Sequence, residues 1–154
     1  PACVMSPVLQ KLGAEAEVVV AELVPAVVAW NRGPLAELAG RPLEDVRVTV
    51  HENDIAKVLK AARQDWDAIL LDVDNGPEGL TRARNDWLYS AGGLNAAFDA
   101  LRPAGVLAVW SAGPAPDFSD RLRRAGFEVE EVRRQARGAR GGARHTIWIA
   151  GRAA

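Results

Sequence analysis

The sequence has little of what marks secreted, membrane or nucleic-acid-binding proteins. Its 154 residues include one cysteine, Cys3, which excludes an internal disulfide and favours a reducing compartment such as the cytoplasm. No apolar run approaches the roughly 20 residues that cross a membrane, and the first residues lack the basic and apolar segments of a signal peptide. The net charge of −1 provides no electrostatic attraction to nucleic acid or to an anionic membrane surface.

Candidate metal ligands are also sparse. Cys3, His51 and His145 are the only cysteine and histidine residues, and they stand far apart in the sequence. Zinc sites use ligands at close, paired spacings. The sequence therefore predicts no metal centre.

What is present is a globular composition, with 49% hydrophobic and 25% charged residues. Together with the length, this composition predicts a single domain over residues 1–154. The sequence does not begin with methionine, and whether residues precede Pro1 is left open.

Strand-like and helix-like segments alternate along the chain. We expect strands at residues 17–23, 46–51, 67–73, 106–111, 127–132 and 145–150, and helices at 27–38, 55–62, 87–101 and 116–124. The first of these helices is interrupted at Gly33-Pro34, and Asp54 can cap the second. This alternation predicts a three-layer, Rossmann-like α/β fold with a mostly parallel sheet.

The end of the chain departs from this alternation. No helical pattern separates the last two strands, so they must form a hairpin and the final strand must run antiparallel to its neighbours. The loop between them, residues 133–143, is rich in arginine. Because the total charge is nearly neutral, we interpret this loop as a solvated hairpin tip and not as a nucleic-acid contact.

Acidic residues follow three successive strands. Glu22 ends the first strand, Asp54 lies just past the second, and Asp72 ends the third with Asp74 two residues on. Ligands of open parallel sheets bind beyond the carboxyl ends of the strands. A carboxylate at Glu22 can accept both hydroxyls of a ribose, while Asp54 can reach an adenine edge. The neighbouring Ile55 can pack on the adenine ring, so these residues predict a nucleoside site, although single loop carboxylates and helix caps are common.

Asp72 and Asp74 allow two interpretations. As a like-charged pair they would have one raised pKa, which suits proton abstraction. Alternatively, Asp74 braces the turn through Asn75 and Gly76. The nearby aromatic residues also leave two alternatives, because Tyr89, Trp87 and Trp110 can line a pocket or belong to the core. We favour the core for Trp110 and Trp148.

One expected element is absent before Glu22. Nucleoside-binding α/β domains open with a strand and a glycine-rich turn whose backbone approaches the ligand. Residues 1–21 contain one glycine, Gly13, and read as the end of a helix followed by a strand. Either the first strand and its turn lie upstream, or the fold has lost them.

The order of these segments resembles a known family. The segments are VVVAELVPAVVAWN, VTVHENDI, WDAILLDVDNGPEGLT, LRPAGVLAVWSA, AGFEV and HTIWIA. In this order they are similar to spermidine synthase-like proteins, which are aminopropyltransferases built on the class I methyltransferase fold. The resemblance covers about residues 17–150.

The resemblance implies a role for each matching residue. Glu22 matches the acid that holds the ribose of decarboxylated S-adenosylmethionine or of methylthioadenosine, and Asp54 matches the aspartate at the adenine. Asp72 matches the first aspartate of the family's Asp-Ser-Ser-Asp-Pro segment, the base for the attacking amine. Asn75 takes the place of the second aspartate, with Asp74 as a substitute carboxylate.

A tyrosine after this loop binds the diamine in the family, and Tyr89 is the candidate here. The exchange at Asn75 makes putrescine a poor expected acceptor.

These features predict a cytoplasmic transferase that uses S-adenosylmethionine or its decarboxylated form. It would pass a methyl or aminopropyl group to an amine or another small nucleophile, with polyamine chemistry implied by the resemblance. Its expected partners are small molecules, with no nucleic acid and no membrane, and a homodimer is left open. The alternative is a non-catalytic domain of the same fold that serves as a subunit or interaction module.

Overall fold

The computed structural model describes residues 2–72, 77, 86–113, 115–135 and 144–154. The chain forms two units, Pro1–Val58 and Leu59–Ala154, and each is described by itself. No helix in the described ranges is long and apolar enough to cross a membrane.

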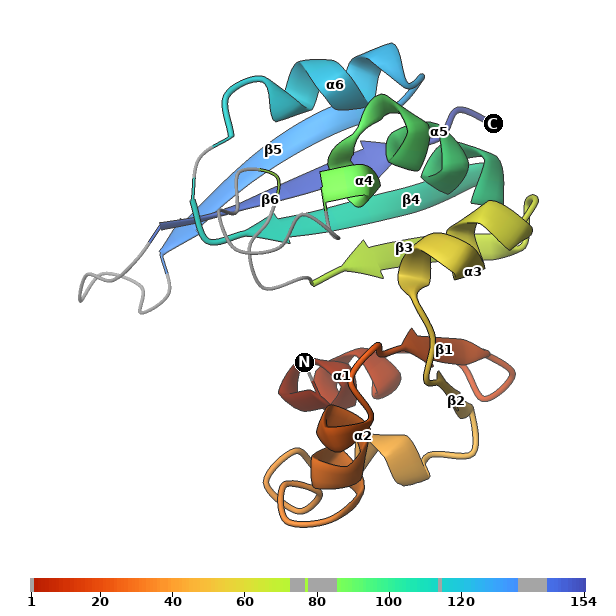
Figure 1. Cartoon of the computed structure of the whole chain (residues 1–154), viewed down its shortest axis with the longest axis vertical. Coiled ribbons are helices and arrows are strands. Elements are labelled where there is room, and N and C mark those ends of the chain that lie inside the picture. The colour runs from red at the N-terminus through yellow and green to blue at the C-terminus, as the bar shows by residue number, and fades with distance from the viewer. Residues whose placement is uncertain (1, 73–76, 78–85, 114, 136–143) are drawn as a thin grey trace. The chain divides into compact units, whose positions relative to one another are not determined.

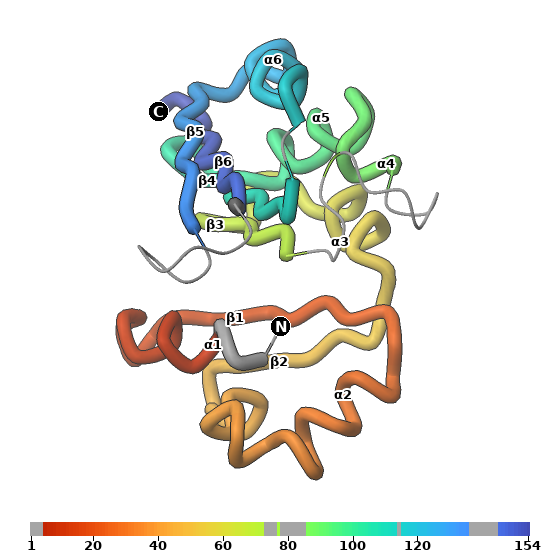
Figure 2. The backbone as a smooth tube through the Cα atoms, turned by 90° about the vertical axis from the view of Figure 1, so that its left-hand side faces the viewer, coloured from red at the N-terminus to blue at the C-terminus, as the bar shows by residue number. Residues whose placement is uncertain are grey.

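The first unit is built around two short parallel strands. It contains α1 (Ala2–Leu9), β1 (Val18–Ala21), α2 (Pro25–Arg32), the 3-10 helix η1 (Pro42–Glu44), β2 (Val48–His51) and the start of α3 (Ile55–Ala61). Valines dominate both strands, and β-branched side chains favour extended backbone. The strands pair from Val18 opposite Val48 to Ala21 opposite His51, and Figure 2 shows them side by side. Parallel pairing places the carboxyl ends of both strands at one edge.

Helix α2 is shorter than predicted. It begins at Pro25. Proline lacks an N–H, but the first N–H groups of a helix have no partner within the helix, so no hydrogen bond is lost. It ends at Gly33, whose N–H donates to the carbonyl oxygen of Trp30 at 3.3 Å. The residues from Gly33 to Gly40 form turns, because Gly33-Pro34 stops the helix instead of kinking it.

Arg47, just before β2, forms hydrogen bonds to the end of α1 and the residues that follow it. Its guanidinium donates to the carbonyl oxygens of Leu9, Leu12 and Gly13 at 3.0–3.1 Å. It also forms an ion pair with Asp45 at 2.7 Å. The hydrogen bonds that Arg47 donates to Asp45 lower the pKa of the Asp45 carboxyl to about 2. The pair therefore stays ionised at neutral pH and keeps the carbonyl contacts in place.

The second unit contains a four-stranded sheet of order β3-β4-β6-β5. Its elements are β3 (Trp66–Leu71), α4 (Asp86–Tyr89), α5 (Ala91–Ala100), β4 (Leu101–Ser111), α6 (Phe118–Arg124), β5 (Glu128–Gln135) and β6 (Arg144–Gly151). β3 and β4 are parallel, and β6 lies antiparallel between β4 and β5. The predicted α/β class and the antiparallel final strand are therefore confirmed.

The core of this unit lies between the sheet and three helices. α4, α5 and α6 lie over one face of the sheet (Figure 1), against buried residues such as Leu107 and Val109 of β4. Trp148 of β6 is fully buried there. Its indole N–H donates to Ser119 Oγ at 3.0 Å, and its ring meets Phe118 edge to face at 5.0 Å. Trp148 is a core residue, as predicted.

Trp110 does not share that core. Side chains alternate between the two faces along a strand, so Trp110 points away from the face that holds Leu107 and Val109. It is half-buried, and its ring lies 5.1 Å from the ring of His145. The prediction of a core position for Trp110 is wrong because it sits on the face opposite the helices.

The helix predicted for residues 87–101 is two helices. Ser90 separates them, because its Oγ accepts from the Gly93 N–H at 3.3 Å and donates to the Trp87 oxygen at 2.7 Å. A serine cap of this kind starts α5 anew. The following strand begins at Leu101, earlier than predicted, since its first residues pair with the start of β3.

The structure also defines where α6 ends and where the hairpin loop begins. α6 ends at Arg124, as predicted, and Gly126 follows two residues later with a φ of 99°, a conformation that favours glycine. β5 continues through Gln135, so residues 133–135 belong to the strand and not to the hairpin loop. Residues 136–143 lie outside the described part of the chain.

Candidate functional site

Glu22 lies at the carboxyl edge of the first unit's sheet, directly after β1. Its backbone N–H donates to the carbonyl oxygen of His51 at 3.0 Å, which continues the parallel pairing by one residue. Its half-buried carboxylate accepts the Val24 N–H on Oε1 at 2.9 Å. The second oxygen, Oε2, has no hydrogen-bond partner within the described ranges and is available to a ligand.

Asp54 lies just after β2 and begins α3. Its Oδ1 accepts the Ala56 N–H at 2.8 Å, which confirms the predicted helix cap. Asn53 Oδ1 in turn accepts the Asp54 N–H at 2.9 Å and holds the turn. Ile55, the first residue of α3, is half-buried. The cap therefore engages one oxygen of Asp54, and no described residue engages the other.

The pairing of β1 with β2 brings these acids to one edge. Glu22 follows β1, and Asp54 follows the neighbouring parallel strand β2. The exposed Glu52 lies between the end of β2 and Asp54 in the sequence. None of the three forms an ion pair with a described residue. The edge is therefore anionic, with carboxylate oxygens that can accept hydroxyl hydrogen bonds and attract a cation.

In the second unit, Asp72 and Tyr89 lie within electrostatic reach of each other. Asp72 is exposed, directly after β3, and Tyr89 is buried at the end of α4 with 3% of its surface exposed. Burial, and then the charge of Asp72, raise the pKa of Tyr89 to about 12. Two of the residues predicted for catalysis and substrate binding therefore interact electrostatically, although α4 begins 14 residues after Asp72.

Within the described part of the chain, the surroundings of Tyr89 offer its hydroxyl no hydrogen-bond partner. Its ring packs edge to face on Phe118 at 5.8 Å, and its carbonyl oxygen accepts from Arg121 Nη1 at 3.3 Å. No described residue makes a hydrogen bond to the hydroxyl. A buried hydroxyl without a hydrogen bond destabilises a fold by about 1–3 kcal/mol, so it is a natural contact for a ligand.

Sequence reasoning missed the contribution of α6 to these surroundings. Phe118 and Arg121 contact Tyr89 from that helix, and the guanidinium of Arg121 lies 5.1 Å from the Phe118 ring centre. The only signal in the sequence was position, because α6 follows the carboxyl end of β4. Helices that begin there commonly border ligand sites in parallel sheets.

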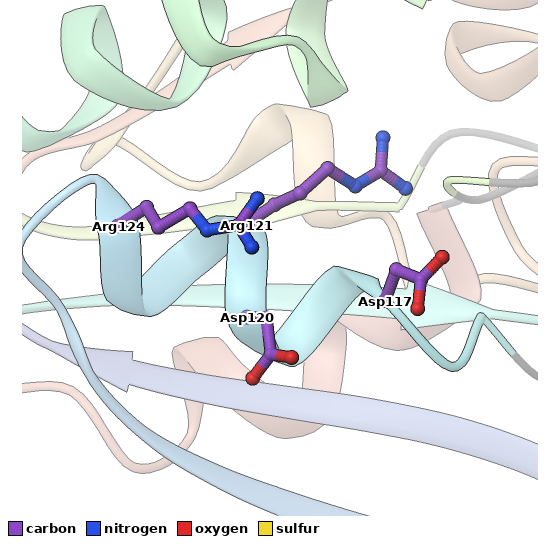
Figure 3. A pocket seen from close by; sticks show the side chains of 4 residues that line it. All are labelled: Asp117, Asp120, Arg121 and Arg124. Atoms are coloured by element: carbon purple, nitrogen blue, oxygen red, sulfur yellow. The ribbon is translucent and has the colours of Figure 1, made fainter.

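A shallow pocket on α6 does not coincide with the predicted site. It has a volume of about 590 Å³ and is lined by two acidic and two basic side chains (Figure 3): Asp117, Asp120, Arg121 and Arg124. An ion pair of 2.9 Å joins Asp120 to Arg123 beside it. A second hollow, in the first unit, is lined by the end of α1 and by residues 44–47. Neither hollow includes a residue predicted for the site.

Two predicted site residues, Asp74 and Asn75, lie outside the described residues. Among the residues that are described, no group of three or more histidine, cysteine or acidic side chains could hold a metal ion.

Replacing Tyr89 by phenylalanine is expected to stabilise the protein by about 1 kcal/mol at pH 7, because it removes a buried hydroxyl that makes no hydrogen bond to any described residue. The pH dependence should change as well. The pKa of Tyr89 is raised from 10 to about 12, so the folded state keeps a proton that the unfolded state loses in this range. The contribution of Tyr89 to the wild-type free energy of unfolding is therefore fully present below pH 10 and is lost as the pH rises towards 12. Tyr89→Phe should remove this pH dependence.

Urea unfolding at pH 7 and pH 11 measures both effects. Tyr89 is the one tyrosine in the sequence, so its phenolate absorbance titrates without overlap from another tyrosine. A loss of stability in Tyr89→Phe at pH 7 would contradict the assignment, because it would mean that the hydroxyl already has a partner.

No protein-family model matches the chain, and no curated protein matches it significantly in sequence. Solved structures do match. A spermidine synthase in complex with the transition-state analogue AdoDATO has a TM-score of 0.78 at 16% identity, over 97% of this chain and 52% of that one. A probable spermidine synthase from Corynebacterium glutamicum has a TM-score of 0.68 at 20% identity, over 98% and 52%.

The S-adenosylmethionine-dependent methyltransferase SibL, in its apo form, also matches. Its TM-score is 0.56 at 22% identity, over 90% of this chain and 44% of that one. The chain spans about half the length of the solved structures that it matches. It therefore has the α/β fold of spermidine synthases and S-adenosylmethionine-dependent methyltransferases, as its sequence predicts.

Proposed function

We propose that this chain is the nucleoside-binding part of a group transferase that uses S-adenosylmethionine or its decarboxylated form. The acceptor is a small amine, which receives a methyl or aminopropyl group. The observation that carries the proposal is the pair of Asp72 and Tyr89: an exposed carboxylate beyond a parallel strand interacts electrostatically with a buried tyrosine whose hydroxyl has no hydrogen-bond partner among the described residues. The fold shared with transferases of both kinds supports it.

Glu22 and Asp54 are the proposed nucleoside contacts. A ribose offers two hydroxyl donors, and Glu22 has one carboxylate oxygen that no described residue uses. Asp54 is held rigidly by its role as a helix cap, and Ile55 beside it offers an apolar surface for a ring. The donor chemistry of this edge therefore fits a nucleoside.

A sulfonium donor supplies an electrophilic carbon and a neutral thioether leaving group. The protein's own task is to align the acceptor and to remove one proton. As the acceptor nitrogen forms its bond to carbon, the electron pair of the carbon–sulfur bond returns to sulfur. Asp72 takes the proton from nitrogen, so the charge balances without a further reagent.

The Asp72 region is the proposed acceptor site. An exposed carboxylate attracts a cationic amine, and the Tyr89 hydroxyl gains a hydrogen bond when a polar ligand reaches it. Asp74 and Asn75 follow Asp72 in the sequence and are proposed as further acceptor contacts. Because Asn75 is neutral, the acceptor is proposed to be an amine that needs fewer carboxylates than putrescine does.

Binding tests the nucleoside site. A ligand at about 100 times its dissociation constant adds about 2.7 kcal/mol of stability, so the full-length protein should melt several degrees higher with the correct nucleoside. The ligands to compare are S-adenosylmethionine, its decarboxylated form and methylthioadenosine. Glu22→Ala should lower the affinity at least about tenfold, because it removes hydrogen bonds from a charged acceptor.

Glu52→Ala is the matched control, since it removes an equal charge from the same edge but from an exposed side chain with no proposed ligand contact. Calorimetry should give the Glu52 variant nearly the wild-type affinity. Equal affinities for wild type and Glu22→Ala, or equal losses in both variants, would rule out a specific ribose contact.

A further inference from the structure

The face of the four-stranded sheet opposite α4, α5 and α6 is apolar at its centre. Leu70 of β3 is 60% exposed on this face, and Ile149 of β6 is 39% exposed. Ala108 of β4 pairs with both residues and lies between them on the same face. Trp110, two residues further along β4, is half-buried on this face as well. These residues form a flat apolar surface on which an aromatic ring can lie.

Trp110 forms a ring pair with His145 at the carboxyl end of β4. Antiparallel pairing places the start of β6 at this end, with Thr146 opposite Ser111. The ring centres of Trp110 and His145 are 5.1 Å apart, and the ring planes differ by 31°. His145 is half-buried, and its Nδ1 atom is buried without a hydrogen bond to any described residue. Such a nitrogen can donate or accept a hydrogen bond when a polar ligand group reaches it.

Asp72 lies at the same level of the sheet as this ring pair. The pairing of β3 with β4 extends to Leu71 opposite Val109, and the residues that follow directly are Asp72 and Trp110. β4 lies between β3 and β6. Neighbouring strands are about 4.8 Å apart, so the backbones that carry Asp72 and His145 are separated by about 10 Å. An exposed carboxylate, an aromatic ring and a nitrogen that no described residue engages therefore follow one another along this edge.

We propose that Trp110 and His145 hold the acceptor, and that this acceptor is an amine with a polar-substituted aromatic ring. The inference rests on the proposed function and names the substrate class of that site. The ring stacks on Trp110, the ring substituent forms a hydrogen bond with His145 Nδ1, and the amine lies at Asp72. The transfer step stays as described, with the amine proton passing to Asp72 and the electron pair of the carbon–sulfur bond returning to sulfur.

Calorimetric titrations of the protein with tyramine, phenethylamine and putrescine, each with and without methylthioadenosine, test the proposal. Tyramine and phenethylamine differ only in the ring hydroxyl, and putrescine has no ring. Tyramine should bind about fivefold more tightly than phenethylamine, which is the usual contribution of one hydrogen bond. Putrescine should bind most weakly of the three.

Trp110→Leu should weaken tyramine binding by roughly tenfold, because it removes the aromatic surface but keeps an apolar side chain. Putrescine binding should change by less than about twofold in this variant, since no ring contact is lost. Trp30→Leu is the matched control. Trp30 is a tryptophan of α2 that is 54% exposed and has no proposed ligand contact. This control should bind tyramine as the wild type does.

His145→Phe separates a ligand contact from a structural role. The variant keeps a ring beside Trp110 and loses the nitrogen. It should bind tyramine and phenethylamine equally well, with the phenethylamine affinity near the wild-type value. A purely structural role of His145 would lower both affinities by the same factor and leave the preference for tyramine intact, which would contradict the proposed hydrogen bond.

Two further results would overturn the proposal. One is tyramine binding no tighter than putrescine binding, and the other is equal tyramine affinity in the wild type and in Trp110→Leu. A protein that binds the nucleoside and uses putrescine but not tyramine would keep the proposed function and lose this inference. A protein that binds tyramine through Trp110 and His145 but binds no nucleoside would keep this site and lose the proposed function.

Discussion

Replacing Asp72 by asparagine is expected to lower the rate of group transfer by about 10²–10⁴-fold, the usual contribution of a positioned base. The amide keeps the shape of the side chain but cannot take the proton that the amine loses. Because Glu22 and Asp54 are the proposed nucleoside contacts, nucleoside affinity should stay near the wild-type value. Single-turnover rates with S-adenosylmethionine, its decarboxylated form and a panel of amines measure the loss.

Asp67→Asn provides the matched control for this variant. Asp67 lies near the amino-terminal end of β3, the strand that Asp72 follows, and pairs with Arg102 at 2.7 Å on the exposed surface. An exposed ion pair contributes about 0–1 kcal/mol, so this variant should keep its activity. If Asp72→Asn is as active as Asp67→Asn, the proton acceptor is another residue, or the chain carries the fold without the reaction.

Replacing Trp148 by alanine is expected to lower the free energy of unfolding by about 3–5 kcal/mol. The side chain is fully buried between the sheet and α6, and its removal leaves a cavity beside Phe118. It also removes the indole donor from Ser119, whose hydroxyl donates in turn to Glu131 at 3.1 Å. Urea unfolding measures the loss, which is a large share of the 5–15 kcal/mol that stabilises a typical domain.

Trp110→Ala is the control, because it removes the same side chain from a half-buried position on the other face of the sheet. Its effect should stay below about 2 kcal/mol. If Trp148→Ala does not fold, Trp148→Phe gives a graded measurement, since it keeps an aromatic ring and loses the indole donor with part of the ring volume. Equal losses in the two alanine variants would show that the core does not lie on the helix-covered face alone.

Much of this fold could be predicted from the sequence because the deciding signals are local. Hydrophobic runs at residues 67–71 and 106–111 identify interior strands, and Asp54 marks the start of α3 through a cap that needs only the next two residues. The absence of a helical pattern between residues 127 and 145 is sufficient to predict the hairpin. Parallel pairing then brings Glu22 and Asp54 to one edge without further information.

Other features depend on contacts between distant segments. Whether Trp110 or Trp148 enters the core depends on which face the helices cover, and alternation along a strand does not tell one face from the other. The contact of Tyr89 with α6 is also beyond the reach of periodicity, because Phe118 and Arg121 come from a helix that follows the next strand. The break at Ser90 was missed because the apolar spacing continues across it.

The position of β6 has a consequence for the order in which the second unit folds. Of the described strands of this unit, β6 is synthesised last, yet it lies between β4 and β5 in the finished sheet. Until β6 is available, β4 and β5 have no common neighbour, and the indole that fills the core is missing. The sheet therefore cannot assemble strand by strand in the order of synthesis. A nascent chain without β6 exposes unpaired strand edges, which makes it prone to aggregate.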